Sequence, residues 1–132
     1  MALQVEVVSP EQVLYSGECT QVLARTLDGE IGFLTGHAPF LGALGIGVVR
    51  LTTMSGDQVS IAVHGGFVEV SNNLVTLLSD VAESGAGIDV ERAREAASRA
   101  TSVLAADSDS DEALDALRRA ETRLRAAGAE EA

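Results

Sequence analysis

The hydrophobic pattern of the chain changes once, near Ser84–Gly87, and this change limits what the chain can fold into. Before it, apolar residues such as Leu3, Val5 and Val7 alternate with polar ones, a period of two that is typical of strands with one buried face. After it, the alternation ends and Ala, Glu, Asp, Arg and Leu dominate, which are mostly good helix formers. The sequence therefore predicts a β part followed by an α part.

The first part contains several strand-like runs separated by turn signals such as Ser-Pro, Asp-Gly and Asn-Asn. Many short strands at roughly 8–12 residue spacing favour a β-sandwich or barrel, here of about eight to ten strands. Gly65 and Gly66 predict a bulge or close backbone packing. They do not predict a phosphate loop, because no helix begins after them. The runs that follow the first strand are Thr20–Thr26, Glu30–Leu34, Val48–Thr53, Gln58–Val63, Phe67–Ser71 and Leu74–Leu78.

The second part predicts two helices. Asp89 is the expected N-cap or first-turn acid of a helix that runs to about Ala105. The segment DSDSD ends this helix and caps a second one, from about Asp111 to Ala127, and Gly128 is the expected stop.

The apolar stripes of these helices are narrow and rich in alanine. Two such short helices are marginal alone, so we expect them to pair antiparallel and to rest loosely on the β part. The predicted organisation is an all-β sandwich domain over residues 1–86 and a mobile two-helix domain over residues 87–132. The stripes consist of Val90, Ala93, Ala97, Ala100 and Leu104 on the first helix and Leu114, Leu117 and Leu124 on the second.

Charge and cysteine content exclude several classes of function. The net charge of −11 disfavours binding to nucleic acid or to anionic lipid. Cys19 is the single cysteine, so the chain has no internal disulfide and no multi-cysteine metal site; we expect a buried, inert thiol. No apolar run reaches the length of about 18 residues that a membrane span requires.

Seven of the nine basic residues, all arginines, lie in the helical part. Arg92 and Arg99 are seven residues apart and Arg119 and Arg123 are four apart, so each pair shares a helical face. If the paired helices bring these faces together, four guanidinium groups converge and match the oxygens of a polyphosphate. Spacing alone favours the alternative, a solvated face with ion pairs along each helix, to the carboxylates of Glu95, Asp115 and Glu121.

Three stretches resemble one known family. The segments GEIGFLTGHAPFL (29–41) and IAVHGGFVEVSNNLVTLLSDVAE (61–83), with the opening LQVEVVSPEQVLYSGE, resemble the epsilon subunits of bacterial F-type ATP synthases. The resemblance covers most of residues 3–93. It implies a ten-stranded sandwich with a two-helix C-terminal domain, in a non-catalytic rotor subunit that lies peripherally on the cytoplasmic side of the bacterial plasma membrane.

The resemblance also implies partners. The sandwich would bind the gamma subunit and the polar loops of the c-ring, and the extended helices would reach the alpha/beta catalytic head. The ring contact would be a loop carrying Glu30, Ile31, Gly32 and His37. For His37, a hydrogen bond to backbone is an equally good interpretation.

A regulatory ATP site is implied by IDVERA (88–93), which is similar to the family's nucleotide-binding pattern I/L-D-x-x-R-A. No cofactor is required, and the presence of magnesium beside the nucleotide stays open. The arginines would neutralise phosphates, the apolar residues would pack on adenine or ribose, and the acids would accept hydrogen bonds. The matching residues are Glu83, Ile88, Asp89, Arg92, Ala93, Arg99, Arg119 and Arg123.

The implied mechanism is a switch in which ATP holds the helices down on the sandwich and low ATP lets them extend along gamma and block hydrolysis. This sequence departs from strongly inhibitory members, because DSDSDEALD and GAEEA make both ends of the second helix acidic. Contact with an acidic catalytic head is therefore disfavoured, and we expect weak inhibition.

Two alternatives come from other classes of function. An enzyme would need convergent catalytic groups, yet the two histidines, His37 and His64, lie in separate turns without partners at metal-ligand spacing. The second alternative is an adaptor of the same fold that binds a protein unrelated to ATP synthase. Co-purification with a gamma-like partner would distinguish an epsilon subunit from such an adaptor.

Overall fold

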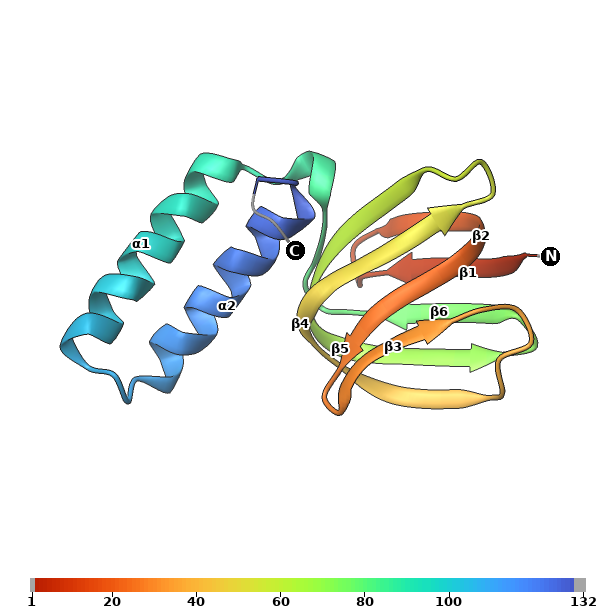
Figure 1. The fold of residues 1–132 in the computed structure, drawn as a ribbon, viewed down its shortest axis with the longest axis horizontal. Coiled ribbons are helices and arrows are strands. Elements are labelled where there is room, and N and C mark those ends of the chain that lie inside the picture. Colours follow the sequence, from red (N-terminus) through yellow and green to blue (C-terminus); the bar gives the residue numbers. More distant parts are fainter. Residues whose placement is uncertain (1, 130–132) are drawn as a thin grey trace.

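The period-two segments form strands, each with one face in a common core. The computed structural model describes residues 2–129, and within them the β part has seven strands followed by a 3-10 turn and two helices (Figure 1). In chain order these elements are β1 Leu3–Val8, β2 Val13–Thr26, β3 Gly29–Phe33, β4 Phe40–Thr53, β5 Gln58–Ser71, β6 Leu74–Leu78, β7 Ala82–Ser84, η1 Gly85–Gly87, α1 Val90–Ala106 and α2 Asp111–Ala126.

The strands form one sheet that closes on itself. Its order is β1-β6-β5-β4-β2-β3, β1 also pairs with β2, and β7 adds to β5. The β1–β6 pair is parallel and the other pairs are antiparallel. The result is a barrel-like sandwich, which confirms the predicted fold class of a β-sandwich followed by an antiparallel helical hairpin.

The strand count is lower than the predicted eight to ten because three strands are long. β2, β4 and β5 each have 14 residues, and β5 joins the two runs expected at Gln58–Val63 and Phe67–Ser71. It bends at Gly65 and Gly66, which have φ values of 88° and 117°. The β4–β5 register is the same on both sides of this bend, so the predicted bulge is absent. The alternative, close backbone packing, is what the structure shows, because a Cβ at Gly66 would collide with the carbonyl oxygen of Leu78.

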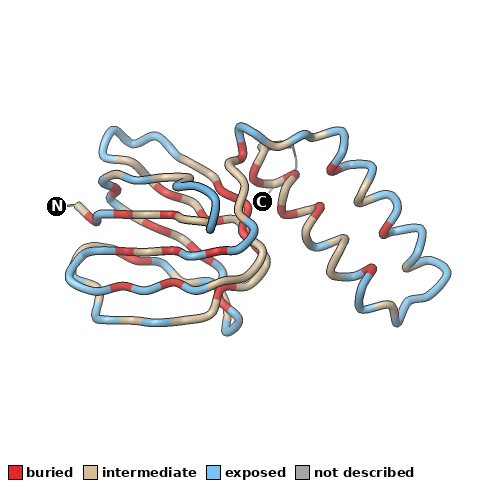
Figure 2. The backbone as a smooth tube through the Cα atoms, turned by 180° about the vertical axis from the view of Figure 1, so that it is seen from behind, coloured by how far each residue is buried: buried red, intermediate tan, exposed pale blue. Residues whose placement is uncertain are grey.

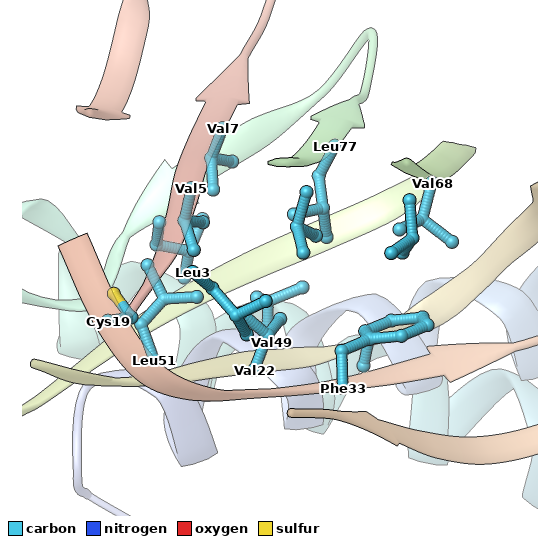
Figure 3. Close-up of a cluster of buried hydrophobic side chains, with 14 of the residues drawn as sticks. Leu3, Val5, Val7, Cys19, Val22, Phe33, Val49, Leu51, Val68 and Leu77 are labelled. Atoms are coloured by element: carbon cyan, nitrogen blue, oxygen red, sulfur yellow. The ribbon is translucent and has the colours of Figure 1, made fainter. Parts of the chain in front are cut away.

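The core is built mainly from aliphatic side chains because aromatic residues make up only 3% of the chain. Figure 3 shows its centre, where Phe33 lies among leucines and valines from several strands. Buried positions alternate with exposed ones along the strands (Figure 2). Cys19 is fully buried, as expected, and its thiol donates to the hydroxyl of Tyr15 at 3.4 Å.

The helix ends follow the predicted caps. Asp89 is the N-cap of α1 and accepts a hydrogen bond from the backbone N–H of Arg92 at 3.1 Å. Ser110, inside the DSDSD segment, caps α2 by accepting from the backbone N–H of Ala113 at 3.2 Å. Gly128 follows α2 with a φ of 76°, as expected for a helix stop. Neither helix of residues 2–129 is long and apolar enough to cross a membrane.

The hairpin packs through small residues, and α2 lies between α1 and the strands (Figure 1). Ala93 and Ala100 of α1 are buried, as are Ala113, Ala120 and Leu124 of α2. The predicted stripe is wrong at Leu114, which is 37% exposed because the helices meet along the alanines instead.

Candidate functional site: the contact between the hairpin and the sandwich

Glu83 on β7 and Arg123 on α2 connect the sandwich to the hairpin. The Nε of Arg123 donates to the Oε1 of Glu83 at 2.6 Å. β7 fixes Glu83 by pairing with β5, where Glu83 lies opposite Ala62. The Glu83 and Arg123 side chains are 38% and 28% exposed, so water screens this ion pair in part.

His64 lies next to this ion pair, in β5 and not in the expected turn, and sequence reasoning gave it no place at this site. Its Nε2 is 3.5 Å from the Oε1 of Glu83 and its side chain is 4% exposed. Neither ring nitrogen has a hydrogen-bond partner among residues 2–129, since the contact with Glu83 lacks hydrogen-bond geometry. A buried polar group without a partner costs about 1–3 kcal/mol, which marks this position as unusual.

Burial and the neighbouring charges shift the pKa of His64. Burial lowers the pKa of His64 below its ordinary value, the positive charges of Arg123 and Arg119 lower it further, and Glu83 acts in the opposite direction. Arg119 lies one turn before Arg123 on the same face of α2. We call Glu83, His64, Arg119 and Arg123 the Glu83 cluster; it combines two arginines with a single carboxylate.

The IDVERA motif surrounds the start of α1. Asp89 uses its side chain as the helix cap, Ala93 is buried between the helices, and Ile88 is half-buried. Arg92 is exposed and forms no ion pair within the part of the chain that the structure describes. Its guanidinium group is therefore available to a ligand.

Arg99 is placed apart from the Glu83 cluster. It lines a pocket of about 390 Å³ between the helices, together with Ala113 and Ala116 of α2. These alanines precede Arg123 by two to three helical turns, since a turn has about 3.6 residues. The structure thus brings together Glu83, Arg119 and Arg123 of the predicted ATP site and places Arg99 elsewhere on the hairpin.

The predicted ring-contact residues do not lie in one loop. Glu30, Ile31 and Gly32 are part of β3, whereas His37 follows the end of that strand. Glu30 lies near the start of β3 and His37 lies beyond its end. Because an extended chain advances about 3.3 Å per residue, the two side chains are at opposite ends of the strand.

His37 is held by local contacts. Its Nδ1 lies 2.7 Å from the carbonyl oxygen of Ala38, which agrees with the expected alternative of a backbone hydrogen bond. Its ring packs edge-on against Phe33 and Phe40, at centroid distances of 5.0 and 6.2 Å. The backbone N–H of Gly36 donates to the side-chain oxygen of Asn73 at 2.7 Å and ties this turn to the β5–β6 turn.

Comparison with known proteins supplies the family. The model of the ATP synthase delta/epsilon chain β-sandwich domain matches residues 2–85. The ATP synthase epsilon chain of Gloeobacter violaceus is 43% identical over 132 residues, which cover 98% of this chain and 99% of the relative. The chain belongs to the ATP synthase epsilon chain family. The epsilon chain of Streptomyces griseus is 45% identical over 124 residues, or 94% of each chain.

A solved structure supports the fold of the whole epsilon chain. A chain in the cryo-EM structure of the Euglena gracilis mitochondrial ATP synthase, which holds OSCP, F1 and the c-ring, superposes with a TM-score of 0.71. It is 23% identical, and the match covers 97% of this chain and 78% of that one. Both the sandwich and the helices are therefore included in the likeness.

Family membership decides between the alternatives that the sequence left open. Epsilon chains are non-catalytic subunits of the central stalk of F-type ATP synthase, so this chain is not an enzyme in its own right. An adaptor of the same fold outside ATP synthase is set aside for the same reason.

Proposed function

We propose that this epsilon chain couples the gamma subunit to the c-ring through its sandwich and regulates ATP hydrolysis through a mobile hairpin formed by residues 87–132. The observation that carries the regulatory part is the Glu83 cluster. It contributes polar contacts between hairpin and sandwich, and it has an excess of positive charge. It also holds a buried imidazole that no described residue hydrogen-bonds.

The contact between hairpin and sandwich is of the strength that a switch requires. The Glu83–Arg123 pair is partly exposed, and such pairs contribute about 0–1 kcal/mol. Apart from this pair, α2 contacts β4, β5 and η1 mostly through small or partly exposed side chains. The free energy that holds the hairpin down is therefore small enough for a ligand to change its population.

ATP would supply that free energy if it binds only the docked hairpin. Its phosphates can accept hydrogen bonds from Arg119 and Arg123. Arg92 on α1, which pairs with no carboxylate of residues 2–129, can donate to them as well. At 100 times its dissociation constant a ligand stabilises the state it binds by about 2.7 kcal/mol. Low ATP then frees the helices to extend along gamma toward the alpha/beta head, where they oppose hydrolysis.

The acidic start of α2 limits this inhibition in our proposal. Asp111 and Glu112 occupy its first turn, where the helix dipole favours negative charge, and this turn forms the tip of the hairpin. A tip of this charge is repelled by an acidic partner surface. The expected inhibition is thus weaker than in members whose second helix is basic.

A calorimetric titration of ATP into the full chain tests the site. We expect saturable one-to-one binding that Arg92→Ala weakens at least about tenfold, since hydrogen bonds to charged groups contribute about 1.5–3 kcal/mol. Arg94→Ala is the matched control, because Arg94 is an exposed arginine of the same helix that pairs with Glu91.

Two outcomes would count against the ATP site. One is no saturable heat up to millimolar ATP, which would reduce the arginines to a solvated helical face. The other is an equal loss of affinity in the Arg92 and Arg94 variants, which would indicate attraction to overall charge and not a site.

A further inference from the structure

A second group of arginines lines a pocket of about 490 Å³ between α2 and the strands β2, β3 and β4. We call it the arginine pocket. The hairpin contributes Arg118, Thr122 and Arg125, and the sandwich contributes Arg25 and Arg50 together with Glu30. None of its arginines belongs to the predicted ATP site.

The fold explains why these side chains meet. Arg118, Thr122 and Arg125 are spaced by four and three residues, so they share one face of α2. This face differs from the one that presents Arg119 and Arg123 to the Glu83 cluster. Thr122 is only 2% exposed, so this face of α2 is turned toward the strands.

The strands complete the other wall. Arg25 of β2 lies opposite Glu30 of β3, and Arg50 of β4 lies opposite Leu23 of β2. Gly47 leaves room for the stem of Arg25, because a Cβ at this glycine would lie 2.9 Å from the Cβ of Arg25. A side chain at position 47 would push Arg25 out of its present place.

The charge of the pocket is opposite to that of the chain. The chain has a net charge of −11, yet four of its nine arginines line this pocket with a single carboxylate. Arg118 reaches Asp115 at 3.6 Å, but Arg25, Arg50 and Arg125 form no ion pair with any residue in the range 2–129. Guanidinium groups that line one pocket repel one another, and an anion bound among them relieves this repulsion.

We propose that the arginine pocket binds a phosphate-bearing anion at the joint between hairpin and sandwich, apart from the site proposed for ATP. Arginine forks bind phosphate oxygens in pairs, and the volume lies in the range of about 300–1,000 Å³ that is usual for ligand pockets. Because the walls come from α2 and from the strands, the anion binds only when the hairpin is docked. It therefore stabilises the docked state, in proportion to its concentration.

Inorganic tripolyphosphate, titrated calorimetrically into the full chain, is the probe. We expect one saturable site that Arg50→Gln weakens about tenfold or more, as for other charge-assisted hydrogen bonds. Arg118→Gln, whose parent side chain is 59% exposed and lies outside the sheet, provides a second variant that leaves the sandwich intact. Arg94→Gln removes the same charge outside the pocket and should leave affinity within about twofold.

Two results would overturn the proposal. In one, tripolyphosphate gives no saturable binding up to about 10 mM, an affinity too weak for a site. In the other, Arg119→Gln abolishes binding while Arg50→Gln and Arg118→Gln do not, which places the anion at the Glu83 cluster. If ATP displaces tripolyphosphate from the pocket, the natural ligand carries its phosphates on a nucleotide. If ATP does not displace it, the natural ligand is a free phosphate or polyphosphate. Either result supports an anion site in the pocket.

The two proposed sites can fail separately. Arg92→Ala reports on the site proposed for ATP and leaves the arginine pocket unchanged, whereas Arg50→Gln does the reverse. Loss of one response with retention of the other therefore identifies which proposal is wrong.

Discussion

Replacing Gly85 with alanine should loosen the hairpin without changing any charge or any proposed ligand residue. Gly85 is buried in η1 beneath the C-terminal end of α2. A Cβ at this position would collide with the carbonyl oxygen of Ala126 and lie 3.1 Å from that of Ser60. Ser60 belongs to β5 inside the sheet, so we expect the end of α2 to move.

The size of the effect follows from this collision. Added methyl groups in well-packed sites cost about 1–3 kcal/mol, which corresponds to a roughly 5- to 150-fold change in the ratio of docked to undocked hairpin. Gly87→Ala is the matched control, because a Cβ there meets no atom within 4 Å and the residue lies two positions away in the same turn.

Limited digestion with trypsin measures this ratio directly. The chain has no lysine, so trypsin can cut only after its nine arginines, seven of which lie in the helices. When opening and closing are fast, the cleavage rate follows the population of the open state. Cleavage after Arg123 and Arg125 reports on α2, and cleavage after Arg50 in β4 reports on the sandwich.

We predict that Gly85→Ala accelerates cleavage in α2 by at least about fivefold and leaves the Arg50 site protected, while Gly87→Ala changes neither. Equal α2 cleavage rates in the Gly85 and Gly87 variants would refute the reasoning. An equal acceleration at Arg50 would also refute it, because the substitution would then unfold the sandwich and not release the hairpin.

Two further predictions concern the sandwich. Gly66→Ala should lower the free energy of unfolding in urea by about 1–3 kcal/mol more than Gly65→Ala. Both variants replace a glycine of positive φ, but only a Cβ at Gly66 collides with the carbonyl oxygen of Leu78. Equal losses in the two variants would contradict the packing at this bend. Because the pKa of His64 is lowered, the unfolded state takes up its proton first as the pH falls, so stability should decline below about pH 6.5, by at most about 1.4 kcal/mol per pH unit. His64→Gln should remove this component, and an unchanged slope would show that His64 titrates normally.

The local pattern of the sequence was sufficient to predict the architecture of a β part followed by two capped helices. The change of period near residue 84, the caps at Asp89 and DSDSD, and the glycine pair at 65–66 all depend on neighbouring residues, and each appears in the structure. The strand count was not predictable in this way. The runs before and after Gly65 and Gly66 continue as one strand because the partner strand β4 continues beside them in an unchanged register.

The sites depend on contacts between distant residues. Glu83 and Arg123 are 40 residues apart, and the position of α2 on the sheet decides that they meet. The arginine pocket needs both the β2–β4 pairing and the seating of α2, so spacing on the helix indicates only that Arg118 and Arg125 share a face. Arg99 shows that helical spacing can also mislead. It shares a helical stripe with Arg92 in the sequence, but it lines a pocket in a different part of the hairpin.

The central claim is that the hairpin senses ATP and opposes hydrolysis, and ATP hydrolysis by the assembled ATP synthase tests it most directly. The enzyme should be compared with the full chain and with a chain that lacks residues 88–132, at low and at high ATP. The account predicts faster hydrolysis by the truncated enzyme at low ATP and a difference that disappears at high ATP, where the docked hairpin is favoured. Equal rates at both concentrations would contradict it and leave the sandwich as the functional part of the chain.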